Sequence, residues 1–255
     1  MWKYFEDNND EQALQSSRNF IEVNEMKKFF GLIFLMGLNK KPKLRYYWSQ
    51  NILYKQDAFL SPESLSRDRF LHILRFLRFV DYENLQTNDS LAKVRPFLSI
   101  VQHLCKNTYI PEQNVCIDET LLLFKGRFKL RQYVPSKRSR YGIKTYIACE
   151  SKTGYAFNIL SHQFSNELNT ILTSVHGADN LMLSQKIVVY LCEHILNQGY
   201  HIFIDNYFSS TNLAKFLLEN DTLMTGTIRK GRGVPATLVN TNVPPKNFEC
   251  VTQKR

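Results

Sequence analysis

The fold is decided by two similar stretches of sequence, NVCIDE at residues 114–119 and YHIFIDN at residues 200–206. Each stretch is mainly apolar and then reaches an aspartate, Asp118 in the first and Asp205 in the second. A continuously apolar strand is typical of a strand that is covered on both faces of a sheet. The two stretches therefore predict neighbouring core strands that each end on a carboxylate.

Carboxylates at the ends of neighbouring buried strands favour a bound cation. An unpaired charge beside a low-dielectric interior is costly, and two carboxylates side by side repel each other unless a cation lies between them. Oxygen ligands suit Mg²⁺ or Mn²⁺, and two such ions can stabilise both the attacking and the leaving oxygen of a phosphodiester. Asp118 and Asp205 thus indicate phosphoryl chemistry on nucleic acid. A turn or N-cap role for Asp118 and for Asp205-Asn206 is an open alternative.

The segments around these strands predict a mixed sheet with helices. Apolar runs at 143–149 and 155–160 flank Lys152-Thr153-Gly154 and indicate a hairpin, and residues 120–124 continue the first strand. Farther along the chain we expect a helix, a strand, a helix and a strand at residues 184–196, 201–204, 209–219 and 223–228. This order of elements predicts an α/β fold class.

The residues before Pro111 have a helical pattern. One helix is expected from an N-cap at Asn24 to Leu38, and its apolar residues are spread so widely that we expect it to be covered on nearly all sides. A second helix is expected to open at Ser61-Pro62-Glu63, and a third spans residues 92–105. Phosphate contact and a solvated face are both open interpretations for the arginines of the second helix, which are Arg67, Arg69, Arg75 and Arg78.

The composition is that of a folded, basic protein. The chain has 255 residues, 33 Lys and Arg against 23 Asp and Glu, and hence a formal net charge of +10. Because 44% of the residues are hydrophobic and 13% are aromatic, the chain can bury a core, which excludes intrinsic disorder. The excess of positive charge favours a polyanionic partner.

The positive charge is concentrated close to the first aspartate. No acidic residue occurs between Thr120 and Cys149, whereas aromatic side chains alternate there with basic ones. Fixed positive charge with interleaved aromatics suits the phosphate backbone and the bases of DNA, and solvent exposure of these charges is the alternative interpretation. The expected DNA-binding residues in this segment are Lys125, Arg127, Lys137, Arg138, Arg140 and Lys144. A second, glycine-containing cluster contributes Arg229, Lys230 and Arg232.

Several other classes of protein and site are excluded by spacing. The five cysteines form no C-x-x-C pair and the six histidines form no H-E-x-x-H motif, so we expect no zinc in this chain. Neither a P-loop nor a G-x-S-x-G elbow is present. The longest apolar run, Phe29–Leu38, is too short to span a bilayer. We expect an intracellular protein without a membrane or small-molecule partner, and a nuclear one because its expected partner is DNA.

Five segments resemble the PiggyBac transposase family. They are Ile117–Leu121, Pro135–Lys144, Cys149–Tyr155, Ile204–Ser210 and Gly226–Lys230. The upstream segments Phe34–Pro42, Tyr47–Ser49 and Ser66–Phe70 also look like the helical region of this family. The resemblance therefore extends in order from about residue 22 to residue 235.

This resemblance implies a ribonuclease-H-like core that cleaves DNA and transfers strands at TTAA sites with three metal-binding aspartates. Asp118 matches the first aspartate and Asp205 the second, so both are the expected catalytic and metal-binding residues, with Mg²⁺ or Mn²⁺ as the cofactor. The resemblance also implies DNA as partner and a homodimer. It divides the chain into a helical region at 1–110, for dimerisation or DNA binding, and the first part of a DDD catalytic core at 111–255.

The sequence also departs from the family pattern. Only 255 − 205 = 50 residues follow Asp205, and none of them matches the motif of the third aspartate. We therefore expect a C-terminally truncated and catalytically incomplete chain, and a domesticated DNA-binding protein without catalysis is the alternative.

Overall fold

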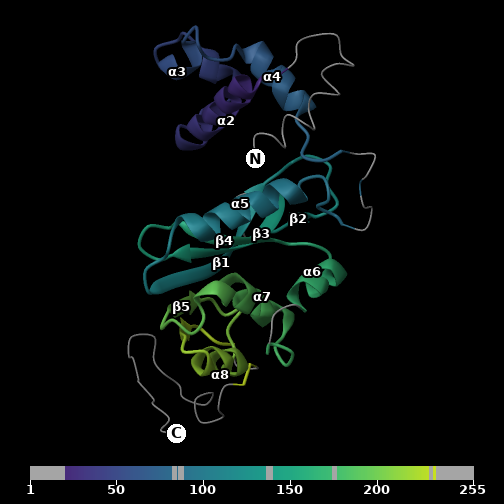
Figure 1. The fold of residues 1–255 in the computed structure, drawn as a ribbon, viewed down its shortest axis with the longest axis vertical. Helices are drawn as coiled ribbons and strands as arrows, with labels where there is room; N and C mark the ends of the chain where they lie inside the picture. The colour runs from purple at the N-terminus through teal and green to yellow at the C-terminus, as the bar shows by residue number, and fades with distance from the viewer. Residues whose placement is uncertain are drawn as a thin grey trace. The chain divides into compact units, whose positions relative to one another are not determined.

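The computed structural model describes residues 21–81, 85, 89–135, 140–173, 177–229 and 232–233. The chain forms two compact units, residues 1–100 and 101–255, and each is considered by itself (Figure 1). The first is helical and the second is built on a sheet. No helix in the described ranges is both long enough and apolar enough to cross a membrane. The expected DNA-binding residues Lys137, Arg138 and Lys230 lie outside the described residues.

The helical unit is held together by an aromatic core. Its elements are α2 (Val23–Leu38), the short helix η1 (Leu44–Trp48), α3 (Asp57–Leu60) and α4 (Arg67–Phe76). Phe29 of α2 packs on Phe70 of α4 with ring centroids 4.8 Å apart, and both side chains are almost fully buried. Trp48 contacts Phe70 and Phe59, so that every helix contributes an aromatic ring to one core.

Three details of this unit differ from the prediction. The helix expected at Ser61 begins five residues later, since the side chain of Ser66 accepts the N–H of Arg69 and is the actual N-cap. Likewise, α2 is capped by Glu22, not by Asn24. The expectation that α2 is covered on nearly all sides is also wrong, because the exposed fractions of Phe34 and Leu38 are 69% and 86%.

The sheet unit contains one mixed, six-stranded sheet. Its strands are β1 (Asn114–Leu123), β2 (Arg131–Tyr133), β3 (Tyr141–Glu150), β4 (Ala156–Ser161), β5 (His201–Ile204) and β6 (Leu223–Gly226). The order is β2-β3-β1-β5-β6, and β4 pairs with β3. β1 runs antiparallel to β3 and parallel to β5, and β5 runs parallel to β6. The α/β class predicted from the sequence is therefore confirmed.

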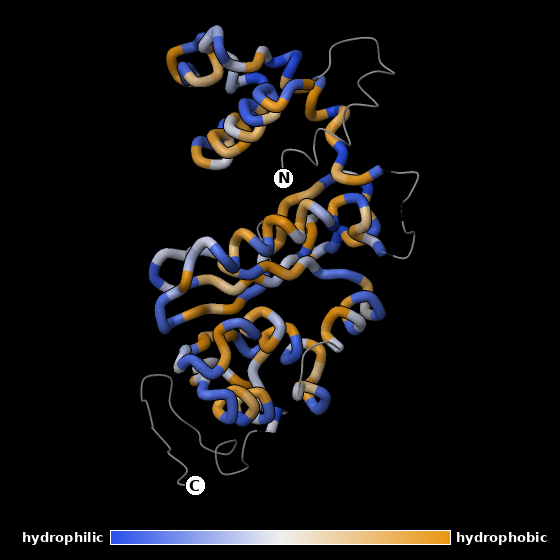
Figure 2. The backbone as a smooth tube through the Cα atoms, viewed as in Figure 1, coloured by the Kyte–Doolittle hydropathy of each residue, from blue (hydrophilic) through white to orange (hydrophobic). Residues whose placement is uncertain are grey.

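The helices of this unit are α5 (Arg95–Thr108), α6 (Ser165–Leu172), α7 (Leu183–Cys192) and α8 (Thr211–Glu219). The division between the two units falls within α5, at Ile100. Helix α7 is the central one: Ile187, Val188, Val189 and Leu191 are almost completely buried in one cluster with the inner residues of the strands. Figure 2 shows the apolar residues concentrated along the strands and along α7. On the opposite face the residues of β1, Asp118 among them, are less buried.

Two elements of the sheet unit have no counterpart in the sequence prediction. Strand β2 has only three residues, which is too short for an alternating pattern to stand out. Helix α6 has eight residues and buries Leu168 and Leu172, four positions apart. The predicted helix at 184–196 is shorter than expected, because α7 ends at Cys192 and a 3₁₀ turn follows.

Candidate metal and nucleic-acid site

Asp118 and Asp205 directly follow the last residue pair of β1 and β5. The parallel register pairs Cys116 with Phe203 and Ile117 with Ile204, and the next residue along each segment is an aspartate. Paired residues on adjacent strands lie about 5 Å apart, so this register brings the two aspartates close to each other. Ile117 and Ile204 are buried in one cluster with residues of α7, and alternation along β1 places Asp118 on the other face. Both aspartates are exposed.

The two carboxylates are oriented by backbone donors. One oxygen of Asp118, Oδ1, accepts the N–H of Glu119 at 2.7 Å, and Oδ1 of Asp205 accepts the N–H of Tyr207 at 2.7 Å. Helix α8 begins at Thr211 with Ser210 as N-cap, so Asp205 makes a local turn contact and does not cap that helix. Asp118 lies within β1 and is no helix cap either. The second oxygen of each carboxylate, Oδ2, has no hydrogen-bond partner among the described residues.

Two cysteines share the face of the sheet that carries the aspartates. Cys116 of β1 pairs with Cys149 of β3, and both side chains are partly buried. Burial raises the pKa of each thiol, and the charge of Asp118 adds to the increase for both. These thiols are therefore neutral at pH 7 and leave the carboxylates as the anionic groups of this face.

The donor set of this face fits a hard divalent cation. Two adjacent carboxylates with free oxygens match the one or two protein carboxylates by which Mg²⁺ is commonly held, the remaining positions being filled by water and substrate phosphate. Among the described residues no group of three or more His, Cys, Asp and Glu side chains that could hold a metal is found. Asp118 and Asp205 thus supply two ligands, and the chemistry of oxygen ligands favours Mg²⁺ or Mn²⁺ over zinc.

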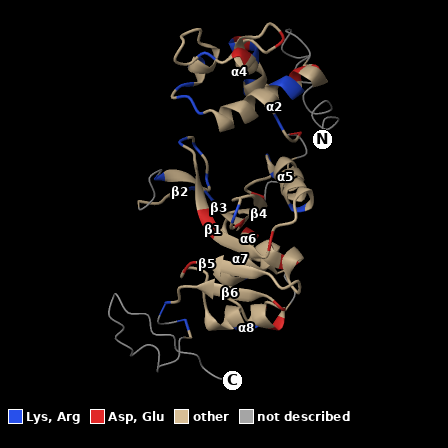
Figure 3. Cartoon of the chain, turned by 90° about the vertical axis from the view of Figure 1, so that its left-hand side faces the viewer, with Lys and Arg blue, Asp and Glu red and all other residues tan. Residues whose placement is uncertain are grey.

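Exposed basic residues lie in the segment that connects β1 to β3. Lys125, Arg127 and Arg140 have exposed side chains in the loops at either end of β2. Arg131 organises one of these loops, because its guanidinium donates to the carbonyls of Lys125 and Gly126 at 3.1 and 3.0 Å. Figure 3 shows the basic segments next to β2 and, close by, the acidic segment of β1. The basic segment predicted to bind DNA therefore lies next to the strand of Asp118.

Three further expected DNA-binding residues lie within the described ranges and are engaged within the protein, namely Lys144, Arg229 and Arg232. Lys144 places its ammonium group 5.0 Å from the ring centre of Tyr146 and 4.7 Å from that of Tyr207. Arg232 donates to the carbonyl of Tyr207 at 2.8 Å, and Arg229 donates to the side-chain amide oxygen of Asn206 at 3.2 Å. The sequence prediction gave Tyr207 no role, although this residue lies two positions after Asp205 in the family-like segment Ile204–Ser210.

The arginines of α4 are likewise engaged within the protein. Arg69 forms a two-pronged ion pair with Glu25 of α2, with nitrogen–oxygen distances of 2.8 and 2.6 Å. Arg67 pairs with the neighbouring Asp68 at 3.0 Å, and Arg75 lies over the ring of Phe76. Neither phosphate contact nor a solvated face describes Arg69, because its ion pair joins α2 to α4.

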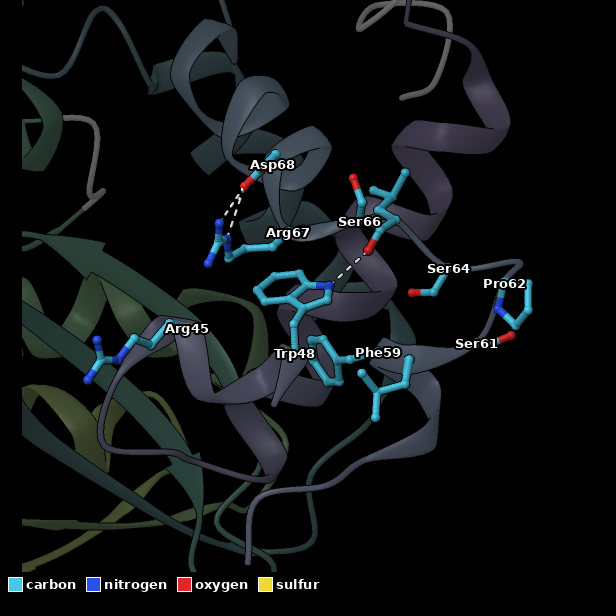
Figure 4. Close-up of a pocket in the computed structure, with 11 residues that line it drawn as sticks. Arg45, Trp48, Phe59, Ser61, Pro62, Ser64, Ser66, Arg67 and Asp68 are labelled. Carbon is cyan, nitrogen blue, oxygen red and sulfur yellow. Dashed lines mark hydrogen bonds and ion pairs between the residues drawn. The ribbon is translucent and has the colours of Figure 1, made fainter. Parts of the chain in front are cut away.

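A cavity of about 490 Å³ lies in the helical unit between η1, α3 and the start of α4 (Figure 4). Trp48 lies in its wall, and the indole Nε1 donates to the carbonyl of Leu65 at 2.9 Å. The indole donor and the Arg67 guanidinium already have partners in the cavity wall, so neither is free to hold a ligand there. The sheet unit thus holds the stronger candidate site.

Known proteins are similar to this chain over residues of both units. A family model described as "Transposase IS4" matches residues 5–255. Human PiggyBac transposable element-derived protein 3 is 30% identical over 207 residues, which are 81% of this chain and 34% of that protein. Human PiggyBac transposable element-derived protein 2 is 27% identical over 217 residues, which are 83% of this chain and 35% of that protein. The chain thus spans about a third of the length of these relatives.

A solved structure has the same fold. The cryo-EM structure of the piggyBac transposase synaptic complex with hairpin DNA matches 96% of this chain and 52% of its own, with a TM-score of 0.77 and 27% identity. The mixed sheet and its helices are therefore of the ribonuclease-H-like type predicted from the sequence. That structure is a DNA complex. In the present chain, the positions of Asp118 and Asp205 follow from its own strand register and hydrogen bonds.

Proposed function

Since the chain belongs to the PiggyBac transposase family, we propose that it binds DNA through the basic segment around β2 and holds a divalent cation at Asp118 and Asp205. The observation that supports this proposal is the parallel register of β1 and β5, whose last pair is followed by an aspartate on each side. In the family setting, such a site serves metal-dependent cleavage and strand transfer at TTAA sequences. The proposal places the protein in the nucleus, where its substrate is.

The roles of the residues follow from their positions. Lys125, Arg127 and Arg140 bind the phosphate backbone, since their charges are exposed and fixed to a structured segment. Asp118 and Asp205 hold the cation through the oxygens that their backbone donors leave free. A bound Mg²⁺ or Mn²⁺ would supply charge stabilisation to a phosphodiester and make a bound water more acidic.

DNA binding without catalysis is the second candidate function. It is favoured by one observation, that the described residues offer two carboxylates and no third metal ligand beside them. In this case Asp118 and Asp205 still bind a cation, and the function is DNA binding by the basic segment around β2. The two candidates share the DNA contact and differ in cleavage.

A titration and a nicking assay test these proposals together. Labelled duplex DNA is titrated with the chain at several salt concentrations, and the same mixtures are incubated with Mg²⁺ or Mn²⁺. We expect affinity that falls steeply with salt, because phosphate binding releases counterions, and no strand cleavage. Affinity that does not change with salt would refute the DNA contact. Nicking that is lost in Asp118→Ala would refute the non-catalytic candidate.

A further inference from the structure

The loop that carries Asp205 is contacted by three basic side chains from two other segments. Lys144 comes from β3, and Arg229 and Arg232 come from the segment after β6. Their contacts fall on Asn206 and Tyr207, the two residues that follow Asp205. The loop is therefore held by positive charge from several directions, although the sequence pattern assigned these three residues to DNA.

Arg232 makes the most direct of these contacts. Its Nη1 donates to the carbonyl of Tyr207 at 2.8 Å and to Ser184 Oγ, at the start of α7, at 3.5 Å. Its own carbonyl accepts the N–H of Thr211, the first residue of α8, at 3.3 Å. Arg232 is only partly exposed, in contrast to Arg127. One residue thus joins the Asp205 loop to two helices.

Tyr207 connects these contacts to the carboxylate. Its N–H donates to Oδ1 of Asp205 at 2.7 Å, while its carbonyl accepts from Arg232. Its ring lies against the ammonium group of Lys144, which also lies over Tyr146, and the hydroxyl of Tyr146 is 3.3 Å from Nδ1 of His162. A change at Arg232 or Lys144 would therefore reach Asp205 through Tyr207.

We propose that Lys144 and Arg232 are positioning residues, which fix Tyr207 and through it orient the Asp205 carboxylate beside Asp118. This inference rests on the proposed function, because it assigns the orientation a role in cation binding. It divides the basic residues into two groups with separate tasks. Arg127 and its exposed neighbours bind phosphate, whereas Lys144 and Arg232 shape the cation site and do not need DNA to do so.

The experiment compares four substitutions in the full chain: Arg232→Ala, Lys144→Met, Arg127→Ala and, as a matched control, Lys215→Met on the exposed side of α8. Three quantities are measured for each, namely amide hydrogen exchange of residues 205–210 without metal, Mn²⁺ affinity, and DNA affinity at fixed salt. Unchanged circular dichroism and unchanged exchange in β4 and α7 show that a variant is folded. Lys144→Arg tests rescue, because arginine keeps the cation–ring contact.

For Arg232→Ala and Lys144→Met, we expect exchange at residues 205–210 to rise about fivefold, since one hydrogen bond or ring contact is lost. Mn²⁺ affinity should fall roughly tenfold, as is typical for partners of metal ligands. Their DNA affinity should stay within about twofold of the parent, whereas Arg127→Ala should lower DNA affinity and leave exchange unchanged. Lys144→Arg should behave like the parent chain.

Two results would overturn the inference. One is unchanged exchange at residues 205–210 in both Arg232→Ala and Lys144→Met. The other is a loss of DNA affinity in these variants as large as that in Arg127→Ala. A parent chain that binds no Mn²⁺ would instead refute the proposed cation site, and the exchange measurement would still decide whether Lys144 and Arg232 fix the loop.

Discussion

Ile117 of β1 and Ile204 of β5 pair in parallel register, and the residue after each of them is an aspartate. Both isoleucines are buried against α7, so the register cannot slip by one residue without moving an apolar side chain to the opposite face. The hydrophobic core therefore fixes the relative position of Asp118 and Asp205. Their mutual repulsion is a cost that the burial of the isoleucines offsets.

The first prediction follows from this repulsion. Replacing Asp118 or Asp205 by Asn should raise the midpoint of thermal unfolding in metal-free buffer. The free energy of unfolding should rise by no more than about 1 kcal/mol, because exposed charges interact through a dielectric close to that of water. Addition of Mg²⁺ should stabilise the parent chain and leave either variant unchanged. A parent chain that is no more sensitive to Mg²⁺ than Asp118→Asn would count against the cation site.

The second prediction separates two arginines that look alike in the sequence. Arg127→Ala should lower the slope of log affinity for DNA against log salt by about 1, since one phosphate contact is lost. Arg69→Met should leave DNA binding unchanged and lower stability by about 1–2 kcal/mol, because it removes the ion-pair partner of the Glu25 carboxylate. Chemical denaturation of both variants and a salt series with DNA provide the measurements. Equal effects of the two substitutions on the salt slope would contradict this division.

The third prediction concerns two glycines. A Cβ at Gly226 would lie 2.4 Å from the carbonyl oxygen of Ile204 and 2.8 Å from Ser209 Oγ, so Gly226→Ala must push β6 away from β5. We expect a loss of about 1–3 kcal/mol, as is usual for overpacking. Gly31 of α2 has no atom within 4 Å of such a Cβ, and Gly31→Ala should stabilise the chain by about 0.5–1 kcal/mol. Urea unfolding of both variants tests this difference in stability. A Gly226→Ala variant as stable as the parent chain would contradict the prediction.

The fourth prediction is a loss of stability in mild acid. Burial, with a smaller contribution from Lys106, lowers the pKa of His194 below 6.5, and the imidazole lies against Phe157. No hydrogen-bond partner for either ring nitrogen exists among the described residues. The pKa of His162 is also lowered, by burial and then by Lys144. Near and below pH 6.5 the unfolded chain therefore binds more protons, and stability decreases as the pH falls.

His194→Phe should reduce this dependence on pH. The free energy of unfolding is measured at pH 7.5 and pH 5.5 for the parent chain, for His194→Phe and for His103→Ala, a control at an exposed position on α5. We expect a smaller difference between the two pH values only in His194→Phe. If all three proteins lose the same stability, His194 does not contribute to the acid sensitivity.

Local patterns made much of the fold and of the carboxylate pair predictable. The apolar runs before Asp118 and Asp205 are continuous in the sequence, and parallel pairing of such strands brings their ends together. Helix starts were less predictable. Ser61 and Ser66 both offer a hydroxyl before an acidic residue, and only the packing of Phe70 and Ile73 selects the second.

The tasks of the basic residues were not predictable from the sequence. Arg127 and Arg232 both occur in basic, glycine-containing segments, and nothing local distinguishes them. The difference arises from contacts across long sequence separations, such as that of Arg232 with Tyr207, which exist only after β5, β6 and α8 have assembled. Charge patterning therefore finds residues that can meet phosphate but not those whose charge is used inside the fold.

In the proposed function, Asp118 and Asp205 form one cation site. Electron paramagnetic resonance of Mn²⁺ tests it most directly, because free and protein-bound Mn²⁺ give different signals without any need for catalysis. We predict that the parent chain binds Mn²⁺, that Mg²⁺ competes for the site, and that Asp118→Asn and Asp205→Asn each abolish the bound signal. A bound signal that persists in both single variants would contradict the account.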